Sequence, residues 1–146
     1  MVIVLLGILS AAVLPKFFAV STYSEQSFFD DTLNAVRYAQ KLAVATGCKV
    51  QVSVSANTYT LKSPADRTQC TSTSPTFSRD IRNPGTGDAS YTYSETGVTL
   101  TSIPAVFNFD ALGQASADVT LTVAGTKSIC VVGNTGFVYE LTTGSC

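Results

Sequence analysis

The fold that we expect is built around one apolar segment, Val2-Ile-Val-Leu-Leu-Gly-Ile-Leu-Ser-Ala-Ala-Val-Leu-Pro-Lys-Phe17. No charged residue precedes Lys16, yet this run is shorter than the roughly 20 residues that a membrane-spanning helix needs. A secretory signal peptide would place a basic leader before its apolar region, whereas the apolar run here begins at the first residue. We therefore expect the interior of a longer apolar helix that the mature protein keeps and that begins upstream of Met1.

A helix that is apolar on all sides has to be buried in lipid or among similar helices. Gly7 and Pro15 are its weak points, because glycine costs roughly 1 kcal/mol relative to alanine in a helix and proline removes a backbone donor. Lys16 can extend toward lipid head groups where such a helix leaves a membrane. The alternative is a buried structural helix of a soluble protein.

Between residues 24 and 46 the pattern becomes amphipathic. The apolar residues that share one face are Phe28, Phe29, Leu33, Ala35, Val36, Ala39, Leu42 and Ala43. Gly47 is the expected helix end, so residues 1–46 predict one long kinked helix on the order of 65 to 70 Å in length. We expect residues 1–23 to lie in a membrane or filament core, and residues 24–146 to form a globular head that includes the amphipathic half of the helix.

The remainder of the chain predicts a small antiparallel β-sheet packed on this helix, which makes the fold class α+β. Val50, Val52 and Val54 alternate with polar residues and predict the buried face of a hairpin that ends near residue 61. Further strands are expected at 97–102, 105–110, 118–123, 127–132 and 137–141. Residues 63–97 contain three prolines and three glycines, and predict a long connection with a short strand at 91–93. Because connections of this length are uncommon in a domain, we expect subtype-specific function there.

Four cysteines, Cys48, Cys70, Cys130 and Cys146, form an even set that indicates disulfides in an exported domain. Of the three possible pairings, Cys48–Cys70 and Cys130–Cys146 are favoured because each closes a short loop, worth about 2 to 4 kcal/mol. Four free thiols in a cytosolic protein are the alternative. Because the sequence has neither histidine nor a C-x-x-C pair, the common zinc sites are nearly excluded.

The composition gives little support to catalysis or to nucleic-acid binding. Without histidine, the usual Ser-His-Asp and Cys-His arrangements are impossible. The nine basic residues are scattered along a chain of formal net charge −1, which makes nucleic acid an unlikely partner. Asp66 with Asp80 or Asp88 offers a weak calcium hypothesis, and no other cofactor is expected. Asp30 and Asp31 diverge by roughly 100° on a helix, so they predict solvated surface and not a paired acid site.

The N-terminal stretch closely resembles the N-terminal helix of type IV pilins and type II secretion pseudopilins, with Gly7 and Pro15 at the family's glycine and proline positions. Residues 36–45, 107–113 and 129–138 resemble the GspH/FimT-like minor pseudopilins, and the first of these also resembles the MSHA minor pilins. The resemblance implies that filament assembly rests on a helix surface comprising Val2, Ile3, Leu5, Leu6, Gly7, Ile8, Leu9, Val13, Leu14, Pro15 and Phe17.

The resemblance further implies a structural subunit and not an enzyme. Its expected partners are other pilin subunits and, before assembly, the bacterial inner membrane; the filament would be periplasmic or extracellular. The family's peptidase cleavage site, aromatic first residue and glutamate would precede Met1. The helix between Gly7 and Pro15 is expected to bend or melt when subunits pack. Two other hypotheses stay open: a membrane-anchored, monomeric binding module that uses residues 63–97, and a DNA-uptake minor pilin.

Overall fold

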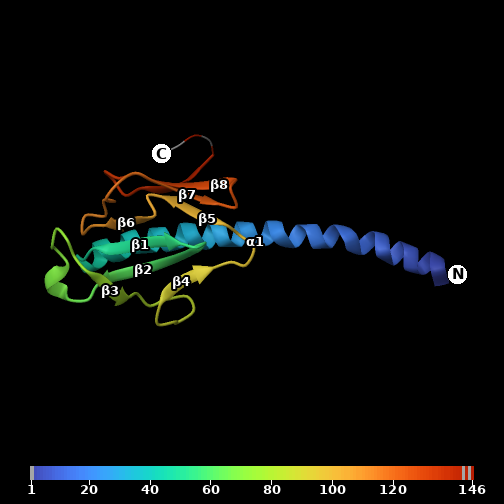
Figure 1. Ribbon diagram of the computed structural model, residues 1–146, viewed down its shortest axis with the longest axis horizontal. Coiled ribbons are helices and arrows are strands. Elements are labelled where there is room, and N and C mark those ends of the chain that lie inside the picture. Colours follow the sequence, from blue (N-terminus) through green and yellow to red (C-terminus); the bar gives the residue numbers. More distant parts are fainter. Residues whose placement is uncertain (1, 143, 145) are drawn as a thin grey trace.

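The computed structural model describes residues 2–142, 144 and 146, and it gives side-chain environments from Thr22 onward. One helix, α1 (Val2–Thr46), runs through the whole molecule: two β-sheets cover its C-terminal half, and its N-terminal half projects away from them (Figure 1). At about 1.5 Å per residue, its 45 residues rise by about 68 Å. Across the part of the chain whose side chains are described, no helix is long and apolar enough to cross a membrane.

The first sheet is antiparallel and has the strand order β3-β2-β1-β6, with β4 also paired to β2. Its strands are β1 (Val50–Ser55), β2 (Thr58–Pro64), β3 (Phe77–Asp80), β4 (Tyr91–Ser94) and β6 (Val106–Phe109). Strand β2 pairs with two strands in succession: residues 58–61 pair with β4, and residues 62–64 pair with β3. The chain between β3 and β4 therefore leaves the sheet and returns to the same edge.

The second sheet is also antiparallel and has the order β5-β7-β8-β9. Its strands are β5 (Leu100–Ile103), β7 (Val119–Val123), β8 (Lys127–Val131) and β9 (Val138–Leu141). Ala124 and Gly125 form the tight turn between β7 and β8, with φ values of 53° and 70°. Positive φ at both positions is the left-handed conformation found in tight hairpin turns, and three residues separate the paired Val123 and Lys127.

The core lies where α1 meets the inner faces of the two sheets. On α1, the predicted apolar face is confirmed: Phe28, Phe29, Ala35, Val36, Ala39 and Ala43 are buried, and Leu33 and Leu42 are half-buried against the cluster. The valines of β1 are buried as the alternation predicts. The buried hydroxyl of Thr32 donates to the carbonyl oxygen of Phe28 at 2.7 Å, so this polar group costs little in the helix.

The α+β class and the single long helix packed on antiparallel β-structure are confirmed, but the description as a small β-sheet head is incomplete, because the strands divide into two sheets. The prediction that residues 63–97 contain only a short strand at 91–93 is also incomplete. This segment holds the 3-10 helix η1 (Arg67–Gln69) and strand β3 in addition to β4. Strand β3 has no alternating apolar pattern and forms because the free edge of β2 offers it hydrogen-bond partners, which a local pattern does not reveal.

Candidate functional site

Two polar side chains of α1 fix the helix against the second sheet. The Arg37 guanidinium donates to the carbonyl oxygen of Val138 through Nε (3.4 Å) and Nη2 (3.2 Å). The Gln40 side-chain amide donates to the carbonyl oxygens of Gly113 (3.1 Å) and Thr135 (3.3 Å). Because these contacts join residues about 70 to 100 positions apart, they set how the helix is oriented on the head.

The Thr-Gly turn between β8 and β9 lies directly against this junction. Gly136 has a φ of 65°, and its backbone N–H donates to the carbonyl oxygen of Val132 at 2.6 Å. A Cβ at this position would overlap the carbonyl oxygen of Gly113 and would stand 2.6 Å from Nε2 of Gln40. The turn therefore requires glycine both for its backbone conformation and for the close approach of a second backbone segment.

Aromatic rings fill the space between α1 and the first sheet. Phe28 and Tyr38 of the helix meet Tyr59, Tyr91 and Tyr93 of β2 and β4, with ring centroids 5.5 to 6.3 Å apart. Burial raises the pKa of the Tyr59 hydroxyl, and the neighbouring Tyr91 raises it further. These contacts hold β4 against the helix, so the returning end of the 63–97 segment is a packed part of the head.

Asp31 lies beside this aromatic cluster at the surface of α1. Partial desolvation raises the pKa of its carboxyl, and the negative charges of Asp30 and Glu95 raise it further. Both aspartates are exposed, as the sequence predicts. The pair is therefore a solvated acidic surface near the point where the helix leaves the head.

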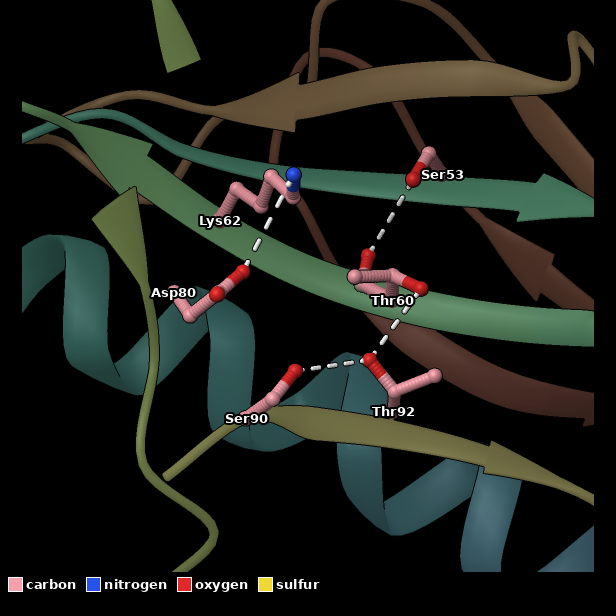
Figure 2. Close-up of polar contacts among 6 residues, drawn as sticks. All are labelled: Ser53, Thr60, Lys62, Asp80, Ser90 and Thr92. Carbon is pink, nitrogen blue, oxygen red and sulfur yellow. Dashed lines mark hydrogen bonds and ion pairs between the residues drawn. The ribbon is translucent and has the colours of Figure 1, made fainter. Parts of the chain in front are cut away.

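The outer face of the first sheet is lined by hydroxyls. Figure 2 shows a row of contacts among Ser53, Thr60 and Thr92. The Ser53 hydroxyl donates to the carbonyl oxygen of Thr60 at 3.4 Å, and the Thr92 hydroxyl donates to the Thr60 hydroxyl at 3.3 Å. Ser90 and Thr92 join the same row through a hydroxyl–hydroxyl contact of 2.8 Å. These hydroxyls therefore find hydrogen-bond partners within the sheet itself.

One ion pair lies in the same region, and its acidic member also lines a cleft. Lys62 on β2 forms an ion pair with Asp80 on β3 (Figure 2), and their Nζ and Oδ1 atoms are 3.8 Å apart. Both side chains are more than one third exposed, so the pair contributes about 0 to 1 kcal/mol to stability. Because of this ion pair, Asp80 already has a cationic partner.

The cleft lies at the end of the head furthest from the projecting helix. It has a volume of about 870 Å³ and opens between the last turns of α1, the end of β2 and the segment from η1 to β3. Tyr38, Leu42, Pro64 and Ile81 supply apolar lining, and Arg67, Arg79 and Arg82 supply positive charge. The cleft is open to solvent, and its lining combines apolar side chains with these charged groups.

Covalent and backbone bonds hold the walls of this cleft in place. The Cys48–Cys70 disulfide, with Cα atoms 4.3 Å apart, ties the η1 segment to the end of α1. The backbone N–H of Ile81 donates to the carbonyl oxygen of Leu61 at 3.4 Å, and the Ile81 side chain is buried. The second disulfide joins Cys130 and Cys146, so the pairing is the one favoured by short loops.

The described residues offer no cluster of three or more His, Cys, Asp or Glu side chains that could hold a metal ion. Each of the three aspartates of the calcium hypothesis has a different interaction partner. Asp66 accepts a hydrogen bond from the backbone N–H of Thr68 at 3.1 Å and caps η1, and Asp80 pairs with Lys62. Asp88 accepts a hydrogen bond from the Thr86 hydroxyl inside its own loop.

The assembly surface predicted from the resemblance, from Val2 to Phe17, lies outside the residues whose side chains the structure describes. Its backbone is helical throughout, because α1 continues through Gly7 and Pro15. The basic cleft is a site that sequence reasoning missed. Three of the four arginines of the chain lie between residues 67 and 82, which is the only sequence signal that could have suggested it.

The sequence matches no model of a protein family and no curated protein. Among solved structures, the chain is similar to the type IV minor pilin FimU of Pseudomonas aeruginosa, with a TM-score of 0.57 and 11% identity, over 83% of this chain and 90% of that chain. It is also similar to the minor pseudopilin EpsH of the Vibrio cholerae type 2 secretion system, with a TM-score of 0.54 and 12% identity, over 82% of this chain and 94% of that chain. The chain therefore has a pilin-like fold, as the sequence predicts.

Proposed function

We propose that this protein is a non-enzymatic subunit of a type IV pilus or a type II secretion pseudopilus that assembles through the N-terminal half of α1. The proposal rests on one observation: the N-terminal half of α1 projects beyond the head (Figure 1). The first side-chain contact between helix and head that the structure describes joins Gln26 to Lys127. Residues 2–25 therefore rise about 36 Å beyond it, and residues 2–15, the uncharged part, account for about 21 Å of this length.

The composition of the projecting half supports the proposal. Residues 2–14 include nine Val, Ile and Leu side chains, and burying each one stabilises the chain by roughly 1.5 to 3 kcal/mol. Leaving all nine in water would cost roughly 14 to 27 kcal/mol, which is at least the upper end of the roughly 5 to 15 kcal/mol that stabilises a typical domain. Since the head covers only the C-terminal half of α1, a membrane or the helices of neighbouring subunits have to bury the rest. Minor-subunit heads in the two similar structures share this fold.

Site-specific crosslinking in cells tests this proposal. Leu5→Cys and Val13→Cys place thiols on the proposed assembly surface, and a short membrane-permeant bismaleimide should link them to thiols in neighbouring subunits. We expect crosslinked species of at least twice the monomer mass for both variants. Thr101→Cys, on the exposed side of β5, is the matched control and should stay monomeric.

The result also separates the two main functional classes. If both helix variants stay monomeric in cells that build the filament, the chain is a membrane-anchored binding module and the filament proposal is wrong. If Thr101→Cys crosslinks as efficiently as the helix variants, the contacts are random collisions in the membrane and give no support to assembly.

A further inference from the structure

We propose that the cleft at the end of α1 binds an acidic peptide segment of a partner protein, one that carries carboxylates on either side of an apolar residue. The site consists of the three guanidinium groups of Arg67, Arg79 and Arg82 around the apolar lining formed by Leu42 and Ile81. This inference goes beyond the role as a filament subunit, since a solubilised monomer contains the complete cleft.

The arginines are available for a ligand. Within the described part of the chain, none of the three guanidinium groups has a hydrogen-bonded or ionic partner, whereas the fourth arginine, Arg37, is bound to Val138. Among the residues that the structure describes, Asp80 is the only acidic side chain that lines the cleft, and Lys62 pairs with it. Positive charge is thus concentrated here on a chain whose formal net charge is −1.

The chemistry of arginine favours carboxylate recognition. A guanidinium presents N–H groups in a planar fork that matches the two oxygens of a carboxylate, and such charge-assisted hydrogen bonds are stronger than neutral ones. The apolar lining from Tyr38, Leu42, Pro64 and Ile81 adds a place for an aliphatic or aromatic side chain. A ligand that satisfies both features carries acidic and apolar groups close together, as an acidic peptide does.

The shape of the site favours a peptide over nucleic acid. Duplex DNA needs cations along a convex or extended track of phosphates, and binding without base contacts depends on many such cations. Here three arginines surround a concave cleft, and the other basic residues of the chain are scattered. A peptide segment can enter the cleft and place its apolar side chain on the lining.

The fold holds the site in a preformed state, which lowers the entropic cost of binding. The Cys48–Cys70 disulfide fixes the wall that carries Arg67. Arg79 lies opposite Ser63 in the β2–β3 register, and the neighbouring Ile81 is buried and bonded to β2. The two arginine-bearing segments are therefore positioned independently, one by a covalent bond and the other by a sheet.

The test uses the full chain in a nonionic detergent and two fluorescein-labelled hexapeptides, EELEEL and its uncharged counterpart QQLQQL, measured by fluorescence anisotropy at low salt. We expect EELEEL to bind and QQLQQL to bind at least tenfold more weakly. Arg79→Gln should weaken EELEEL binding by about fivefold, and the triple variant Arg67→Gln, Arg79→Gln, Arg82→Gln should abolish it. Lys41→Gln is the matched control, because it removes the same charge from an exposed position outside the cleft and should change affinity by less than about twofold.

A charge-reversal variant distinguishes loss of the binding site from loss of the fold. Arg79→Glu should bind the basic peptide KKLKKL more tightly than the unmodified protein does, a gain that a damaged fold would not produce. Equal losses for Lys41→Gln and Arg79→Gln would overturn the proposal, since binding would then follow net charge alone. Failure of EELEEL to bind at millimolar concentration would also overturn it. So would displacement of the peptide by a lower concentration of a DNA duplex of similar charge, which would assign the cleft to nucleic acid.

Discussion

Gly136→Ala should destabilise the head strongly, because this turn lies where a second backbone segment passes. The residue has a φ of 65°, and an added Cβ would overlap the carbonyl oxygen of Gly113. Gln40 donates to that same oxygen at 3.1 Å, so the neighbouring backbone is already held in place by the helix. The methyl group therefore cannot be accommodated by moving a flexible side chain alone.

Two effects set the magnitude of the loss. Forcing a residue with a Cβ into the left-handed region costs about 1 to 2 kcal/mol. Overpacking against a fixed backbone costs about 1 to 3 kcal/mol. The free energy of unfolding should therefore fall by about 2 to 5 kcal/mol, a large part of the roughly 5 to 15 kcal/mol that stabilises a typical domain.

Gly125→Ala is a control that isolates the backbone contribution. Gly125 has a φ of 70°, nearly that of Gly136, but an added Cβ there would meet nothing within 4 Å. It should lose only about 1 to 2 kcal/mol. The measurement is urea unfolding of the full chain in nonionic detergent, followed by far-ultraviolet circular dichroism with a common slope for all variants. Equal losses for the two variants would refute the claim that the approach of Gly113 makes Gly136 necessary.

Two further predictions concern the disulfide and the aromatic cluster. Replacing Cys48 and Cys70 together by serine opens a loop of sequence separation 22 and should lower the free energy of unfolding by about 3 kcal/mol, measured by urea unfolding; an unchanged urea midpoint would contradict this. Burial holds the pKa of Tyr59 in the folded state above its unfolded value of about 10, so the stability that this residue contributes is complete below about pH 10 and decreases as the pH rises above it. Tyr59→Phe should make the decline in unfolding free energy above pH 10 shallower, and an identical pH profile for both proteins would show that Tyr59 does not contribute to it.

The structure of residues 63–97 differs from the connection that their composition predicts. The density of proline and glycine predicted a connection, yet the segment contributes β3 and β4 to the first sheet and one wall of the cleft. Strand β4 could be found locally, because Tyr91 and Tyr93 alternate with polar residues. Strand β3 could not, since only Phe77 is apolar and its pairing depends on the edge of β2.

Local sequence patterns predict the long helix, its apolar and amphipathic halves, the buried valines of β1 and the strands from residue 97 onward. These features follow from periodicity and glycine turns, which act between residues close together in the chain. Those patterns do not predict that the strands form two sheets, that Gly136 meets Gly113, or that Arg67, Arg79 and Arg82 line one cleft. These features depend on contacts between residues far apart in the chain, and a local pattern carries no information about which distant segment will provide the partner.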